Sequence, residues 1–214
     1  MQDIECLHDL VKAFHLSEQE QSLIQKYDEL LLDWSAHTNL VARASLDQRW
    51  VRHYADSLQL WSHIPKGVEK LLDIGSGAGF PAILLAILGK TCSSDMTFTL
   101  VDSVGKKARF LESVVDALSL SKVTVAAQRV EVFHVKQNRY DLITARAVTA
   151  LPKLLTLSAP LLEPKGTLLF PKGEKFQEDV DAASLLWNFS IESIQSMTHD
   201  KARILKLTNI LPKP

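Results

Sequence analysis

The most informative part of the chain is residues 71–81, Leu71-Leu72-Asp73-Ile74-Gly75-Ser76-Gly77-Ala78-Gly79-Phe80-Pro81. An apolar run with an acid near its end is followed by three glycines at alternate positions. Glycine lets the backbone turn sharply and approach a ligand closely. The G-x-G-x-G spacing differs from the G-x-G-x-x-G of dinucleotide-binding turns, and no Lys-Ser/Thr pair follows as in a P-loop. The stretch therefore predicts a strand, a tight ligand-binding turn and the start of a helix.

On both sides of this turn, from Gly67 to the end of the chain, short apolar runs alternate with helical patterns. Such alternation predicts an α/β fold of βαβ units, with a mostly parallel seven-stranded sheet and helices on both faces. The predicted strands are residues 70–74, 97–101, 122–127, 141–145, 167–170, 190–196 and 204–208. The predicted helices are residues 81–88, 106–118, 150–161 and 176–186.

The chain before Pro65-Lys66-Gly67 is predicted to be helical. Ser17 has the position of an N-cap, and apolar residues recur at three- and four-residue spacing from Leu23 to Trp34. A second helical stretch is expected over residues 47–63. We therefore expect an N-terminal helical cap, residues 1–66, and a main domain, residues 67–214. The aromatic residues of this cap are expected to form its core rather than to stack on bases: Trp34, Trp50, Tyr54 and Trp61.

The composition is that of a globular protein, with 46% apolar and 23% charged residues among 214. Cys6 and Cys92 are too few for a disulfide framework and too isolated for a zinc site, so we expect no metal. With an acidic N-terminus and no apolar run near 20 residues, the sequence predicts a cytoplasmic protein with no membrane span.

The net charge of −1 hides an asymmetry along the chain. Residues 1–37 hold two lysines and eight carboxylates, whereas residues 122–175 hold nine Lys/Arg and four acids. A polyanion would be attracted to the second region and repelled by the first. The alternative is a solvated surface of mixed charge.

A second acid, Asp102, ends the second predicted strand, 27 residues after Gly75. An acid at this place can accept hydrogen bonds from both ribose hydroxyls of a nucleoside. Together with the glycine turn, it resembles class I S-adenosylmethionine-dependent methyltransferases. That resemblance implies a Rossmann-like fold, with the turn at the methionine end of the donor, the acid on the ribose, and the loop after the third strand on the adenine. The alternative is a tight turn beside a solvated aspartate.

Further segments narrow the resemblance to one family. In chain order they are Trp34 to Leu40, His53 to Leu58, the glycine turn with Phe80-Pro81, Asp102 to Leu111, Arg129-Val130-Glu131, Thr144 to Ala147 and Pro171-Lys172-Gly173. In this combination the chain resembles the bacterial glucose-inhibited division protein B family. The resemblance implies methylation of a guanine at N7 in 16S ribosomal RNA, with the small ribosomal subunit as partner and the protein as a monomer.

The resemblance also implies roles for individual residues. Gly75, Gly77 and Phe80 match donor-contacting positions, Val130 and Glu131 the adenine-side pair, Arg146 a position in the donor and active site, and Lys172 a basic position at the RNA entrance. Asp73 is a candidate for holding the positively charged end of the donor. Two departures from the family pattern, Val41 and Ala82, remove no group with a known chemical role.

Other polar residues allow two interpretations each. Lys106, Lys107 and Arg109 begin the helix after Asp102 and either bind RNA phosphate or form a solvated face. His53 and Asp56, one helical turn apart, either line a lid over the donor or form a helix-surface pair, and His53 can also be a buried histidine with its hydrogen bonds satisfied. Arg146 either stacks on a base, holds phosphate or donates to guanine O6, or forms an ion pair with Glu131 or Asp73.

The expected chemistry needs no general base. Guanine N7 presents a lone pair and no proton, so positioning and electrostatics should supply most of the rate. The other functions considered are a class I methyltransferase of small molecules or proteins and a donor-binding assembly factor without turnover. A nicotinamide oxidoreductase is disfavoured by the glycine spacing.

Overall fold

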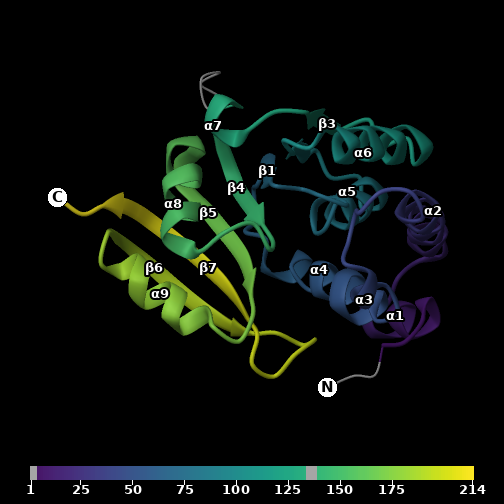
Figure 1. The fold of residues 1–214 in the computed structure, drawn as a ribbon, viewed down its shortest axis with the longest axis horizontal. Coiled ribbons are helices and arrows are strands. Elements are labelled where there is room, and N and C mark those ends of the chain that lie inside the picture. The colour runs from purple at the N-terminus through teal and green to yellow at the C-terminus, as the bar shows by residue number, and fades with distance from the viewer. Residues whose placement is uncertain (1–3, 134–138) are drawn as a thin grey trace.

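The computed structural model describes residues 4–133 and 139–214 (Figure 1), so the first three residues of the acidic N-terminus lie outside it. One sheet has the strand order β3-β2-β1-β4-β5-β7-β6. From β3 to β5 the neighbours are parallel, and β7 is antiparallel to both β5 and β6. The seven-stranded, mostly parallel sheet is therefore confirmed. The strands are β1 (Lys70–Ile74), β2 (Thr97–Val101), β3 (Val123–Ala126), β4 (Tyr140–Ala145), β5 (Leu162–Lys172), β6 (Trp187–Gln195) and β7 (Arg203–Pro212).

Helices cover both faces of this sheet because successive strand residues point to opposite sides. Leu71 belongs to a hydrophobic cluster with the N-terminal helices, whereas its neighbour Leu72 belongs to a cluster on the other face. The first cluster includes side chains of α5 (Ala82–Thr91) and α6 (Gly105–Ala117). The second includes side chains of α7 (Val130–Phe133), α8 (Leu151–Ser158) and α9 (Phe176–Ser184).

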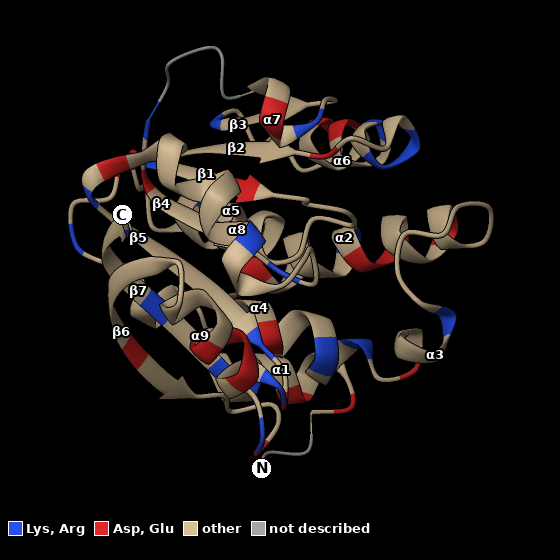
Figure 2. Cartoon of the chain, turned by 60° about the vertical axis from the view of Figure 1, so that its left-hand side comes forward, with Lys and Arg blue, Asp and Glu red and all other residues tan. Residues whose placement is uncertain are grey.

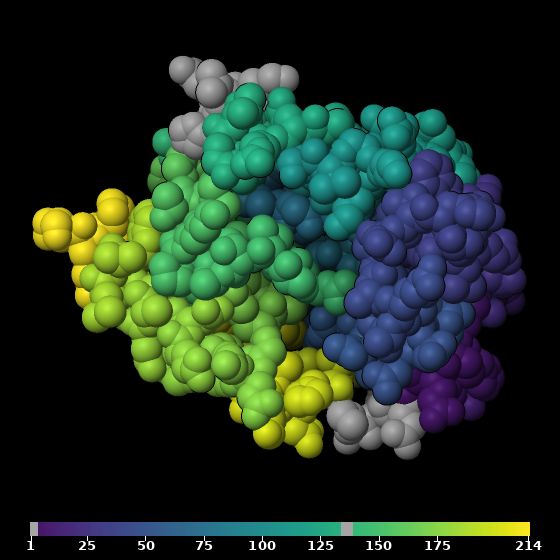
Figure 3. Space-filling view, in the orientation of Figure 1, coloured from purple at the N-terminus to yellow at the C-terminus, as the bar shows by residue number. Residues whose placement is uncertain are grey.

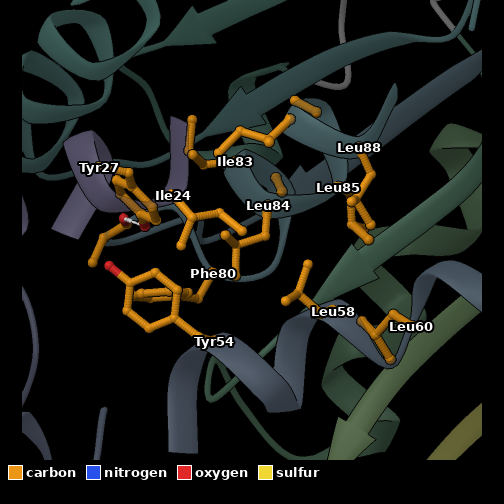
Figure 4. Close-up of a cluster of buried hydrophobic side chains, with 14 of the residues drawn as sticks. Ile24, Tyr27, Tyr54, Leu58, Leu60, Phe80, Ile83, Leu84, Leu85 and Leu88 are labelled. Carbon is orange, nitrogen blue, oxygen red and sulfur yellow. Dashed lines mark hydrogen bonds between the residues drawn. The ribbon is translucent and has the colours of Figure 1, made fainter. Parts of the chain in front are cut away.

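The N-terminal helices are α1 (Leu7–Phe14), α2 (Glu18–Ser35), α3 (Arg43–Leu46) and α4 (Asp56–Leu58). Ser17 caps α2 as predicted, since its hydroxyl accepts from the Glu20 N–H while the Glu20 carboxylate accepts from the Ser17 N–H. The first hydrophobic cluster runs from Ile4 to Ile204 and therefore crosses the boundary expected at residue 66. Figure 4 shows Tyr27 and Tyr54 of the N-terminal part packed beside Phe80 and the apolar side chains of α5.

Helix α5 explains the longest apolar run in the sequence. Every residue from Ala82 to Gly89 is buried, because α5 is enclosed between the sheet and the N-terminal helices. No helix in the described ranges is long and apolar enough to cross a membrane.

Most bounds differ from the sequence prediction by one to four residues, for example β7, which extends to Pro212 rather than 208, and the short α7 was not predicted. Two further differences are larger. The helix expected over residues 47–63 is instead broken into a π-helical segment, Trp50–Ala55, the short α4 and a 3₁₀ turn, Trp61–His63. Strand β5 starts at Leu162 rather than 167, because a register shift opposite Tyr140 and Leu142 accommodates the turn-like Pro164-Lys165-Gly166 within the strand.

Candidate functional site

The glycine turn lies where the strand order reverses. β1 is flanked by β2 and β4, so the carboxyl ends of these strands leave a crevice in which ligands bind in open α/β sheets. The N–H groups of Gly75 and Ser76 both donate to the carbonyl of Val101, at 2.8 and 3.1 Å. Gly75 has φ +67°, and a Cβ added there would lie 2.7 Å from Cγ2 of Val148. The turn therefore requires glycine for its conformation and for the close approach of the β4–α8 connection.

Asp73 is buried at the end of β1 and keeps one free carboxylate oxygen. Its Oδ1 accepts from the Thr144 hydroxyl at 2.6 Å, whereas Oδ2 is buried without a partner among the described residues. Burial raises the pKa of Asp73 to about 7, although the Thr144 hydrogen bond and the Arg146 charge oppose the shift. A buried acceptor without a partner is costly, and a ligand that donates to it removes the cost. This oxygen fits the positively charged amino end of S-adenosylmethionine.

Asp102 ties the glycine turn to the start of α6. Its Oδ2 accepts from the Gly77 N–H at 2.8 Å, and its Oδ1 accepts from the Val104 N–H at 2.8 Å. Because a carboxylate offers about four acceptor sites, both oxygens can still accept from a ribose. Asp102 is 7% exposed, so the backbone bonds hold it largely away from solvent. Neither Asp102 nor Asp73 is among the residues that line the cleft onto which Gly75 and Gly77 open.

The adenine-side pair lies apart from the turn. Val130 is buried and Glu131 is exposed, both on the short helix α7. Neither lines the large cleft into which the glycine turn opens. The structure therefore does not bring these two residues together with Gly75 and Arg146 in one cavity.

Arg146, just after β4, is held by the N-terminal part of the chain. Its Nη1 donates to the carbonyl of Arg52 at 2.9 Å, and its Nη2 donates to Nδ1 of His53 at 3.0 Å. Asp56 Oδ2 lies 3.6 Å from Nη1, and the guanidinium carbon lies 5.3 Å from the centre of the Phe80 ring. Of the ion pairs considered from the sequence, neither Glu131 nor Asp73 forms one with Arg146; the partner is Asp56.

His53 is buried and neutral in this arrangement. Its ring stacks on Phe80 with centroids 5.1 Å apart, and its Nε2 lies 2.9 Å from the Ser45 hydroxyl. Burial, together with the charges of Arg146 and Arg52, lowers the pKa of His53 from 6.5 to about 3. Because guanidinium only donates, Nδ1 must be the acceptor and Nε2 must carry the proton.

The glycine turn and Arg146 open onto one cleft of about 1660 Å³. Figure 3 shows a hollow between the purple and blue N-terminal part and the green segment after β4. The turn between β6 and β7 supplies Ser196, Thr198 and His199 to the lining. Charges of both signs line the cleft, and Figure 2 shows both signs mixed over the chain. The lining of the cleft is therefore not marked out from the rest of the protein by an excess of positive charge.

The basic residues expected to bind RNA lie in different places. Lys172 lines the cleft, but its ammonium is engaged by Asp179 at 2.8 Å and by the carbonyl of Thr149 at 3.0 Å. Lys106 and Arg109 are exposed on α6 and lie outside the cleft lining. Their neighbour Lys107 does line it, and its Nζ lies 4.0 Å from the position of a Cβ on Gly77.

The sequence predicts RNA contacts for Lys106 and Arg109, whereas Lys107 is the member of this group that lines the cleft. The contact between His53 and Arg146 was not predicted. A helical repeat of about 100° per residue separates adjacent lysines, so only one of them faces the turn. The contact between His53 and Arg146 spans 93 residues, and no local pattern encodes it.

Sequence comparisons with known proteins identify a family. Residues 20–208 match the family model described as rRNA small subunit methyltransferase G. Ribosomal RNA small subunit methyltransferase G of Rhodospirillum centenum is 38% identical over 96% of this chain and 91% of its own length. The protein of the same name from Cereibacter sphaeroides is 38% identical over 92% of this chain and 94% of its own.

Solved structures with similar folds are also methyltransferases. A putative O-methyltransferase from Klebsiella pneumoniae has a TM-score of 0.59 at 13% identity and covers 94% of this chain and 95% of its own. The O-methyltransferase from Bacillus cereus, solved with SAH, has a TM-score of 0.57 at 15% identity and covers 86% and 90%. These two support the class I methyltransferase fold, and the sequence matches give the family. The chain belongs to the family of rRNA small subunit methyltransferase G.

Proposed function

We propose that this protein transfers a methyl group from S-adenosylmethionine to N7 of a guanine in 16S ribosomal RNA. Family membership supports the RNA substrate. The donor is supported by one observation above all: the buried Asp73 Oδ2, without a partner among the described residues, beside a turn in which Gly75 has a positive φ and no room for a Cβ. The small ribosomal subunit is the expected partner, the protein is expected to act as a monomer, and its place of action would be the cytoplasm.

Residues at the carboxyl ends of the strands would hold the donor, whose sulfonium supplies an electrophilic methyl group. Asp73 accepts from its amino group, and Gly75 and Gly77 let the backbone approach its methionine end. Asp102 accepts from the ribose. Val130 and Glu131 remain candidates for the adenine, although they lie outside the cleft lining.

The guanine would be positioned by Arg146 without acid–base chemistry. N7 attacks with its own lone pair, so no proton has to be removed before transfer. His53, the buried imidazole nearest to this arginine, is unsuited to be a base, because Nδ1 already accepts from Arg146 and its pKa is lowered to about 3. The guanidinium has five N–H donors, and those that His53 and Arg52 do not use can donate to guanine O6.

Transfer of labelled methyl to three acceptors in parallel tests the proposal. The acceptors are small ribosomal subunits from a strain lacking this modification, protein-free 16S RNA, and a small-molecule extract. Label on subunits or RNA, recovered as 7-methylguanosine, supports the proposal. Label only in the extract would identify a small-molecule enzyme instead, and donor binding with no transfer would favour a non-catalytic assembly factor.

A further inference from the structure

The guanidinium of Arg146 lies at the meeting point of three segments that are distant in sequence. Arg52, His53 and Asp56 come from the N-terminal helices, Phe80 comes from the glycine turn, and Thr198 comes from the turn between β6 and β7. We infer that His53 and Asp56 are positioning residues, which hold the Arg146 guanidinium over Phe80 in the orientation that receives the guanine. The inference rests on the proposed function and names residues of the same site.

His53 fixes one side of the guanidinium through an unbroken series of hydrogen bonds. The Ser45 hydroxyl donates to the carbonyl of Ala42 at 2.7 Å and is therefore free to accept from Nε2 of His53. That leaves Nδ1 of His53 to accept from Arg146 Nη2. Each donor in the series has one acceptor, so only one tautomer and one ring orientation satisfy it.

His53 and Tyr54 are neighbours in the π-helical segment, but their side chains lie in different surroundings. Tyr54 is fully buried and donates to Asp28, whereas His53 turns toward Arg146. A π-helical turn changes the angular register of a helix, and such turns are frequent at functional sites. The break in the predicted helix thus lies where the positioning contact is made.

Asp56 fixes the other side and adds the hairpin turn. Its Oδ1 accepts from the Thr198 hydroxyl at 3.1 Å and from Gln59 Nε2 at 2.9 Å, while Oδ2 faces Arg146. Gln59 also accepts from the N–H of Met197 at 3.0 Å through Oε1. Asp56 therefore links the arginine to the β6–β7 turn, which forms another wall of the cleft.

The guanidinium is planar and rigid, so the hydrogen bonds that it makes within the protein also fix the direction of its remaining N–H groups. Phe80 covers one face, Arg52 and Asp56 contact Nη1, and His53 contacts Nη2. The N–H groups that these contacts leave are the ones available to a ligand in the cleft, which Arg146 lines. A displacement of about 1 Å at such a group can lower a rate about 100-fold. Loss of either positioning residue should therefore lower kcat while the donor still binds.

Two substitutions of His53 distinguish positioning from general stability. His53→Asn keeps an acceptor near the place of Nδ1, whereas His53→Gln places its polar group near Nε2. We expect His53→Gln to lower kcat on small subunits about 10- to 100-fold with the donor Kd unchanged, and His53→Asn to recover most of that loss. His63→Gln, on the 3₁₀ turn away from the cleft, is the matched control. If His53→Gln does not fold, Asp56→Asn replaces it, and the same loss of kcat is expected.

A double-mutant comparison and an NMR measurement complete the test. An Arg146→Lys protein lacks the planar guanidinium that donates to His53. In this background, His53→Gln should change kcat by less than about 2-fold. We expect slowly exchanging Arg146 Nη–H signals in the wild type, assigned by their absence in Arg146→Lys, and expect them to broaden or average in His53→Gln. Undiminished loss in the double variant, or an unchanged Arg146 signal, would overturn the inference. If the wild type methylates no RNA, the proposed function fails, and the NMR signals alone decide the positioning claim.

Discussion

Asp73 and Thr144 face each other across the adjacent parallel strands β1 and β4, and the threonine hydroxyl donates to one oxygen of the aspartate at 2.6 Å. This bond orients the carboxylate and leaves its other oxygen for a ligand. The same strand ends carry the glycine turn and Arg146. The residues that we propose for donor binding and for acceptor positioning therefore lie on neighbouring strands of one sheet.

Replacing Asp73 should remove most of the donor affinity. A hydrogen bond to a charged group contributes about 1.5–3 kcal/mol, so Asp73→Asn should weaken S-adenosylmethionine binding about 10- to 100-fold at pH 8, where the carboxylate is ionised. Calorimetric titration measures the Kd. The control is Asp141→Asn at the opposite end of the sheet, where Asp141 accepts from the N–H groups of Glu69 and Lys70. Equal losses in both variants would contradict the assignment.

Asp73 should also leave a signature in stability against pH. Because burial raises its folded pKa from 3.8 to about 7, the folded protein holds a proton between these pH values that the unfolded chain has released. The contribution of Asp73 to the free energy of unfolding is therefore present at low pH and lost as pH rises to 7. His53, whose pKa is lowered, has the opposite effect but is shared by both proteins. The free energy of unfolding in urea of the wild type, minus that of Asp73→Asn, should therefore decrease as the pH is raised from 4.5 to 7.5. Parallel curves would show that the pKa is not raised.

Adding one methyl group should destabilise the protein at Gly75 in the turn but not at Gly105. Gly75→Ala forces a Cβ against Val148 at a positive φ, which should lower the free energy of unfolding by about 1–3 kcal/mol and weaken donor binding. Gly105→Ala is the control, since its Cβ would meet nothing within 4 Å and it begins α6. Thermal unfolding and donor titration of both variants check this. A stable, donor-binding Gly75→Ala protein would show that the turn tolerates a side chain.

Replacing Lys107 should have a different kinetic effect from replacing Lys106 or Arg109, the other two cations of α6. Lys107 lines the cleft beside Gly77, so Lys107→Ala should lower kcat itself and reduce the salt slope of subunit binding by about 1. Lys106 and Arg109 lie outside the cleft, so any phosphate contact they make should appear in KM at unchanged kcat. Steady-state kinetics at several salt concentrations separate these outcomes. Identical behaviour of Lys106→Ala and Lys107→Ala would remove the distinction.

Local patterns were sufficient for most of the fold. β1 and β2 match their predicted bounds, because each is a short buried run whose ends are marked by polar residues or a glycine turn. The start of β5 was missed, since Pro164 and Gly166 are typical of turns and only the pairing with β4 accommodates them. The broken helix after residue 47 was missed because apolar spacing does not distinguish a π-helical segment from an α-helix.

Strand ends and glycine spacing were sufficient to place Asp73 at the end of β1, Gly75 in the turn that follows and Asp102 directly after β2. Their roles toward a donor stay predictions. The partner of Arg146 could not be predicted, because Asp56 is 90 positions away and reaches it only through tertiary packing. Lys172 and Asp179 are only seven positions apart, but their ion pair depends on how α9 packs against α8 and β6.

Single-turnover methylation of small ribosomal subunits tests the central claim most directly. Wild type and Arg146→Ala are compared at saturating donor, and the product nucleoside is identified by mass spectrometry after digestion. We expect 7-methylguanosine from the wild type, and a rate at least about 100-fold lower for Arg146→Ala with its donor Kd unchanged. A methylated nucleoside other than 7-methylguanosine, or an equal rate for the variant, would contradict it.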